Sequence, residues 1–299
     1  MTQALNTVVD DNTRLAVLPG WVTATAHETP DAAAFRAGAA LAVLDIVLRD
    51  TGAGTLIRDR LALNASEACL ALEGRREATS DIRDAVCLAR AGDALGPAGD
   101  MFAAWRKLAQ INLAAGGWKD RVAAMLPKPV ADAWSDLGEP PSAPIELASQ
   151  ILAKVLRQFP REEAAALMLA DVTLARAIGW DRPVPLFAAH VARRDIRAIA
   201  DGAGAPAQCF YRATVAAGDQ AIRLAADLDR RVAKVRAIAP KLRAKGSDEA
   251  LAVFLSHDAV VPAALPLPDR AARRLCDRLV ELGVVRELSG RPTFRIYGV

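Results

Sequence analysis

Aromatic side chains are scarce in this 299-residue sequence. They make up 5% of the residues, although 53% are hydrophobic, so the apolar content is mostly Ala, Leu and Val. Small aliphatic side chains suit closely packed helices and leave few strands. A chain of this length can also bury a large core. We therefore expect a mainly α protein.

Long apolar runs and targeting features are missing as well. The apolar stretches at 37–47 and 164–178 are short or interrupted by charged residues, whereas a membrane span needs about 20 apolar residues. Residues 1–12 contain acids and no apolar core, unlike a secretory signal. The sequence therefore predicts no membrane contact and a cytoplasmic location.

Cysteine is rare, and its spacing suggests no pairing. The four cysteines form no CxxC pair, and each lies in an apolar helical pattern: Cys69, Cys87, Cys209 and Cys276. This spacing favours buried free thiols in a reducing compartment. It predicts no metal site.

Catalytic and cofactor motifs are not found either. The small-residue run at 38–42 contains no GxxxxGK[ST] phosphate loop, and His190 has no catalytic partner that the sequence positions for it. The acids between Glu67 and Asp84 alternate with arginines, which is typical of a solvated face with weak ion pairs. We predict a non-enzymatic protein without cofactor or metal. A deep pocket lined by those acids would instead favour an enzyme, the third hypothesis.

Proline and glycine divide the chain into predicted parts. The four parts are an N-terminal arm (1–30), an N-terminal helical domain (31–141), a second helical region with a long basic helix (142–245) and a C-terminal domain (246–299). The boundary near residue 142 rests on the stretch Gly138–Pro144, where repeated prolines exclude helix. In the second region we expect a helix at Val184–Ala192 and a long one from about Ala207 toward Pro240.

Residues 269–299 carry the clearest pattern of the chain. Apolar residues first repeat at three and four positions, as on one face of a helix, while arginines occupy the rest of the circumference. Gly283 can end this helix in the left-handed conformation. Two strands, 284–288 and 293–297, follow around a turn in which Gly290 supplies a positive φ. This is the order of a recognition helix and a β-wing.

The segment before it supplies the rest of a helix-turn-helix. Ser247 is a good N-cap for a helix that carries Leu251 and Phe254 inward. A short apolar helix at Ala259–Leu265 and a turn at Pro266–Pro268 then lead into the recognition helix. We therefore predict a multi-helical bundle body with a C-terminal winged helix-turn-helix, whose two-stranded wing is the only expected sheet. A small unit that only packs against the body is the competing interpretation.

Basic residues concentrate toward the C-terminus. Residues 1–150 have a net charge of −5, whereas residues 190–299 hold 19 Lys and Arg against 12 Asp and Glu, a net charge of +7. A basic part of this kind is typical of proteins that approach phosphates. The residues predicted to contact DNA are Arg270, Arg273, Arg274, Arg278, Arg286, Arg291, Arg295, Lys241, Arg243 and Lys245.

The predicted function is binding of double-stranded DNA. The start of the recognition helix would reach base edges in the major groove, and Arg291 at the wing tip would reach the minor groove or the backbone. Because one winged helix reads few bases, a specific operator would require a homodimer through the helical body. The alternative is a helical scaffold whose winged helix docks another protein, as in condensin accessory subunits. A large exposed apolar patch on the wing would favour that alternative.

Several segments resemble a bacterial family catalogued as domain of unknown function 1403. They are Ala34–Asp45, Arg58–Glu77, Ile82–Gly99, Ile178–Ala188, Ala239–Pro262 and the tail itself. That family carries over no activity, but its frequent location on plasmids implies a DNA-related role such as plasmid regulation or maintenance. The tail also resembles the C-terminal winged helix of Fic-related proteins. The Fic catalytic signature HPFxxGNGR is missing, so this second resemblance implies no catalysis.

Overall fold

The structure is a computed structural model that describes most of the chain. The described residues are 17–24, 29–90, 92–135, 143–203, 205–242 and 245–299. The first part of the predicted arm, most of the predicted proline-rich linker and Arg243 lie outside them.

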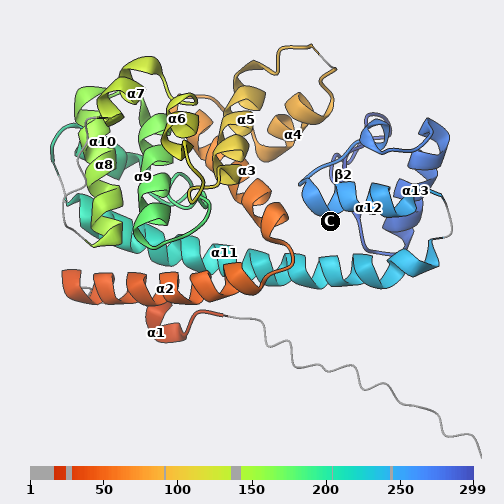
Figure 1. Cartoon of the computed structure of the whole chain (residues 1–299), viewed down its shortest axis with the longest axis horizontal. Coiled ribbons are helices and arrows are strands. Elements are labelled where there is room, and N and C mark those ends of the chain that lie inside the picture. The colour runs from red at the N-terminus through yellow and green to blue at the C-terminus, as the bar shows by residue number, and fades with distance from the viewer. Residues whose placement is uncertain (1–16, 25–28, 91, 136–142, 204, 243–244) are drawn as a thin grey trace, which may run out of the picture.

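Helices dominate the described residues, which form thirteen α-helices, two 3-10 helices and one two-stranded sheet (Figure 1). In chain order the elements are α1 (Gly20–Thr23), α2 (Pro30–Asp50), α3 (Gly54–Leu72), α4 (Thr79–Cys87), α5 (Gly96–Gln110), α6 (Trp118–Ala123), α7 (Lys128–Ser135), α8 (Pro144–Gln158), α9 (Glu163–Ala177), α10 (Arg193–Ala200), α11 (Pro206–Ile238), η1 (Ala239–Lys241), α12 (Ser247–Ser256), η2 (Pro262–Ala264), α13 (Asp269–Glu281), β1 (Arg286–Glu287) and β2 (Tyr297–Gly298). This confirms the prediction of a mainly α fold with a small C-terminal sheet.

The longest of these helices, α11, runs along one side of the molecule (Figure 1). Its 33 residues span about 50 Å at 1.5 Å per residue, and the prediction of a long helix here is confirmed. The helix α2 lies beside α11 and runs in the same direction. Ala40 contacts Gly218, and eleven residues further along both helices Thr51 donates a 2.8 Å hydrogen bond to Asp229. A Cβ at Gly218 would lie 3.3 Å from the Ala40 Cβ, so small residues permit this close approach. No helix of the described residues is both long and apolar enough to cross a membrane.

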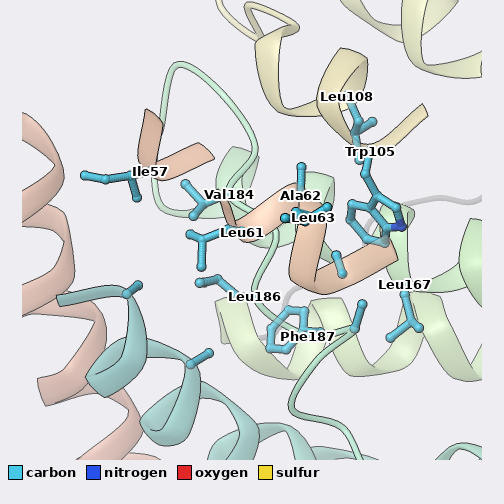
Figure 2. Close-up of a cluster of buried hydrophobic side chains, with 14 of the residues drawn as sticks. Ile57, Leu61, Ala62, Leu63, Trp105, Leu108, Leu167, Val184, Leu186 and Phe187 are labelled. Carbon is cyan, nitrogen blue, oxygen red and sulfur yellow. The ribbon is translucent and has the colours of Figure 1, made fainter. Parts of the chain in front are cut away.

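Between α9 and α10 the chain passes through the core without forming a helix. The sequence predicts a helix at Val184–Ala192, and this prediction is wrong. A short apolar run such as this one gives no period that distinguishes a helix from extended chain. Figure 2 shows Leu186 and Phe187 of this segment in one cluster with Leu61 of α3.

Asp171 of α9 provides hydrogen bonds that this buried irregular backbone needs. Its Oδ1 accepts the N–H groups of Leu186 and Phe187 at 3.1 and 3.3 Å, whereas its buried Oδ2 has no hydrogen-bond partner among the described residues. Burial raises the pKa of Asp171 well above its usual value, and the two N–H donors offset this only in part. The carboxyl group is therefore biased toward its uncharged form.

The C-terminal unit, residues 246–299, lies at the far end of α11 (Figure 1). Its helix α13 is followed by Gly283 in the left-handed conformation, with φ 67°, as the sequence predicts. The strands β1 and β2 pair antiparallel, and Val260 forms a further antiparallel bridge to Tyr297 with two 2.8 Å hydrogen bonds. Extended backbone therefore flanks β2 on both sides.

Three local predictions in this unit are wrong. The predicted helix at Ala259–Leu265 is one bridge residue followed by the single turn η2. The predicted return strand at 293–297 contributes only its last residue to β2, because Phe294 has a φ of 54°, which extended backbone excludes. Ser247 is the first helical residue of α12, and Gly246, with φ 84°, precedes it as the N-cap.

Candidate nucleic-acid interface

The face of α13 opposite its buried stripe carries four arginines, interspersed with Asp277 and Glu281. The buried stripe consists of Ala272, Leu275, Cys276 and Leu279. Arg270 and Arg274 are exposed one helical turn apart, and within the described residues neither has an ion-pair partner. The other two arginines of the helix form exposed ion pairs at 3.1 Å: Arg273 with Asp269 and Arg278 with Glu281. Arg270 and Arg274 can therefore bind a partner without giving up an ion pair, whereas Arg273 and Arg278 would each exchange a weak exposed pair.

The remaining predicted contact residues are more dispersed. Arg286 is exposed on β1, and Arg295 pairs at 3.6 Å with an aspartate of α13. Lys241 and Lys245 are exposed on the connection between α11 and α12. The structure therefore groups the arginines in the C-terminal unit and places the lysines before it.

The wing, residues 288–296 between β1 and β2, contacts the helical body formed by α1–α11. Arg291 donates to both carboxylate oxygens of Asp84 in α4, at 2.6 and 2.7 Å. The same guanidinium also donates to the Phe294 carbonyl at 3.1 and 3.0 Å. The arginine predicted to touch DNA from the wing tip is thus engaged within the chain.

Glu287 organises the start of the wing. Its carboxylate accepts the N–H groups of Ser289 and Gly290, at 2.8 and 3.0 Å, and the Ser289 hydroxyl. Burial pushes the pKa of Glu287 upward, but the hydrogen bonds from Ser289 and Gly290 outweigh it and leave the pKa below its usual value. An ionised carboxylate therefore holds this turn.

A buried ion-pair cluster joins the C-terminal unit to α3 and α4. Asp258, whose side chain is 2% exposed, accepts hydrogen bonds from Arg60 and Arg83; the Arg83 Nε lies 2.7 Å from Oδ2. Two guanidinium groups thus share one carboxylate. Removing the carboxylate would leave two partly buried cations without compensation, which is costly in a protein interior.

Asp59 and Arg106 form a second pair beside this cluster. The Arg106 Nε lies 3.1 and 3.0 Å from the two oxygens of Asp59. Burial raises the pKa of Asp59, and the Arg106 guanidinium counteracts this in part. The pair links α5 to α3 next to the point where the C-terminal unit attaches.

A cleft of about 1090 Å³ lies between α4–α5 and the C-terminal unit. Phe102 and Arg90 line it from the body side, whereas the loop 257–264, one side of α13 and the wing line the other. Cys87 at the end of α4 also lines the cleft, 3.6 Å from the Ala259 carbonyl. Burial raises the pKa of the Cys87 thiol to about 11, so little thiolate forms near neutral pH.

Sequence reasoning missed the residues that hold the two parts together. Arg83 and Asp84 belong to a segment interpreted as a solvated face, yet both bind residues of the C-terminal unit. One signal was present, because Arg58, Asp59 and Arg60 interrupt the otherwise apolar run 56–63, and buried charges need partners.

The acids between Glu67 and Asp84 do not line the cleft. Within the described ranges, no three His, Cys, Asp or Glu side chains are grouped as metal ligands would be. His190 forms a 2.7 Å hydrogen bond with Gln220, and burial lowers its pKa. Of the four cysteines, all free, Cys87 alone is partly exposed.

A search of curated proteins finds no match to this chain. Residues 6–299 match the family described as "Protein of unknown function (DUF1403)", and because the match covers almost the whole chain, the protein belongs to that family.

Proposed function

We propose that this protein binds double-stranded DNA through a C-terminal winged helix, with α13 as the recognition helix. The order α12, bridge residue, η2, α13, β1, wing and β2 supports the winged-helix interpretation. The second helix of a usual helix-turn-helix is reduced here to the single turn η2. The likeness of this unit to the winged helix of Fic-related proteins stays a prediction, as does a cytoplasmic role in plasmid regulation or maintenance.

The observation that carries the proposal is that two exposed arginines of α13 form no ion pair within the described part of the chain. Arg270 and Arg274 project from the exposed side of an amphipathic helix whose opposite side is fixed in a core. Recognition helices present their N-terminal residues to base edges and flanking phosphates. Arg286 and Arg278 lie in the same unit and would add phosphate contacts.

Replacing both arginines should weaken DNA binding and flatten its salt dependence. Each phosphate contact contributes about 0.9 to the slope of log affinity against log salt, so Arg270→Ala/Arg274→Ala should reduce the slope by roughly 2 if both contact phosphates. Fluorescence anisotropy with a random-sequence duplex at several salt concentrations measures both quantities.

The matched control is Arg76→Ala/Arg161→Ala. These arginines are also exposed, and no ion pair involving them occurs among the described residues, so the control removes the same charge from the helical body. Binding that falls equally in both double variants would reflect net charge alone and would count against α13 as the interface. A duplex with a defined operator would further require a homodimer, which sedimentation with DNA would detect.

A protein partner is the second candidate, and Phe294 favours it. This wing residue is 72% exposed, so a protein partner that covered it would remove its apolar surface from water. If no duplex binds at low salt, affinity capture with wild-type and Phe294→Ser chains becomes the informative experiment. A partner retained by the wild type and lost by the variant would support the scaffold hypothesis.

A further inference from the structure

We infer that the cleft between α4–α5 and the C-terminal unit is a binding site for a small organic anion with an apolar body. The inference does not depend on DNA binding. Its volume of about 1090 Å³ lies just above the range of about 300–1,000 Å³ that is usual for small-molecule sites.

Apolar side chains from both parts of the molecule line the cleft. The body contributes Val86 and Phe102, and the C-terminal unit contributes Val253, Val260 and Pro262. Ligand sites combine apolar walls of this kind with a few polar groups that fix orientation. A ligand here would contact both parts at once and remove apolar surface of each from water.

The charged lining residues favour an anion over a cation. They comprise five arginines, Arg83, Arg90, Arg106, Arg273 and Arg295, against four aspartates, Asp59, Asp258, Asp269 and Asp277. Asp258 is shared with a further guanidinium, that of Arg60, so the surroundings hold more positive charge than the lining alone shows. Each of the four aspartates already binds an arginine, which leaves no free carboxylate for a cation.

Arg90 is the group most available to an anionic ligand. Its side chain is exposed at the cleft, and no hydrogen bond or ion pair of its guanidinium occurs within the described part of the chain. Its backbone N–H is fixed by a 2.8 Å hydrogen bond to Asp93. A carboxylate, sulfonate or phosphate can therefore bind this guanidinium without displacing an internal partner.

The wing residue Phe294 belongs to the lining of the same cleft. Phe294 adopts the left-handed backbone conformation, with φ 54°, the single non-glycine residue with positive φ in the described ranges. Arg291 supports this conformation by donating to the Phe294 carbonyl. Uncommon backbone conformations that the surroundings stabilise occur often at ligand-contacting segments.

Two fluorescent probes of nearly the same shape test the inference on the full chain. Anilinonaphthalene sulfonate carries an anionic group on an apolar ring system, and phenylnaphthylamine has the rings without the charge. We expect saturable binding of the sulfonate at one site per chain. Arg90→Ala should weaken the sulfonate about ten- to one-hundredfold, which corresponds to the loss of one charge-assisted hydrogen bond, and should leave the neutral probe unchanged.

A second variant tests the location, and a third controls for charge. Ala264→Trp adds bulk at an exposed position that lines the cleft and should weaken both probes. Arg76→Ala removes an exposed arginine outside the lining and should change neither. Circular dichroism and thermal denaturation of each variant verify that the probes report a folded chain. Non-saturable sulfonate binding, or affinities unchanged in both Arg90→Ala and Ala264→Trp, would overturn the inference.

Discussion

At the scale of single residues, Asp171 shows how one carboxyl group permits an irregular segment inside a helical core. The backbone around Leu186 cannot hydrogen-bond to itself as a helix would, so its N–H groups need an acceptor from elsewhere. Asp171 provides that acceptor, and no cation of the described residues compensates its charge. Its uncharged form is therefore the one that the folded chain favours.

The pH dependence of stability follows from this raised pKa. A group whose pKa is higher in the folded than in the unfolded chain contributes stability that is fully present below its unfolded pKa of about 3.9. That contribution is lost as the pH rises through the folded pKa. Asp171→Asn keeps the acceptor oxygen and removes the titration, so it should be relatively more stable than the wild type at mildly alkaline pH.

Asp171→Leu should instead be destabilised at every pH. It leaves the Leu186 and Phe187 N–H groups without their acceptor, at about 1–3 kcal/mol for each. Thermal denaturation from about pH 4 to about pH 9 compares the three chains across the range in which the carboxyl titrates. Wild-type and Asp171→Asn curves that stay parallel over this range would contradict the assignment of an uncharged Asp171.

Gly298 is required for steric reasons. A Cβ at this position would lie 2.5 Å from the Asp258 carbonyl oxygen and 2.8 Å from Leu288 Cδ1. Gly298→Ala should therefore displace the backbone that carries Asp258 and lower the free energy of unfolding by about 1–3 kcal/mol. Urea denaturation measures the change.

Gly38→Ala is a suitable control for this substitution. Gly38 is helical and exposed, and nothing lies within 4 Å of an added Cβ, so alanine there should stabilise the chain slightly through its higher helix propensity. If both alanine variants had the same stability, the close contact at Gly298 would not constrain the fold.

At the scale of elements, local patterns predicted the helices and missed what joins them. The stripe of α13, its glycine stop and the extent of α11 depend on residues a few positions apart, and all are found. The attachment of the C-terminal unit depends on pairs such as Arg83 with Asp258, which are 175 positions apart. Periodicity carries no information on such pairs.

The errors of prediction have equally local causes. Val184–Phe187 is apolar at almost every position, and such a run has no period that separates helix from extended chain. In the wing, alternation of apolar and polar residues at 293–297 indicated a strand. The contacts of Arg291 and the conformation of Phe294 prevail over that pattern.

The ion pair between Asp84 and Arg291 should determine how firmly the wing is held. Both side chains are about one-third exposed, so the coupling free energy in a double-mutant cycle should be about 1 kcal/mol or less. Asp84→Ala should also speed hydrogen exchange in residues 288–296, including the Leu288 N–H that donates to Ile296.

Asp100→Ala provides the comparison for that experiment. Asp100 is an exposed carboxylate of α5 with no hydrogen bond within the described ranges. Asp100→Ala should leave the rate of hydrogen exchange in the wing unchanged. Equal exchange in the Asp84 variant and the wild type would show that other contacts hold the wing.

At the scale of the whole molecule, the proposed DNA surface and the cleft use different sides of the same unit. Arg270 and Arg274 are absent from the cleft lining, whereas Arg273 and Arg295 are part of it. A duplex on α13 and an anion in the cleft could therefore be bound together. Because Arg291 is held by the helical body, a duplex would first meet the helix and not the wing tip.

The length of α11 gives the attachment of the C-terminal unit a mechanical meaning. A rigid rod of about 50 Å moves at its tip by roughly 1 Å for each degree of tilt at its base. If η1 were its sole connection to the body, the C-terminal unit would move with the end of α11. Small bending of that helix would then change the width of the cleft. The ion pairs of Asp258 and Arg291 with α4 provide a second connection between the C-terminal unit and the body. This connection restrains the unit and keeps the two walls of the cleft at a fixed distance.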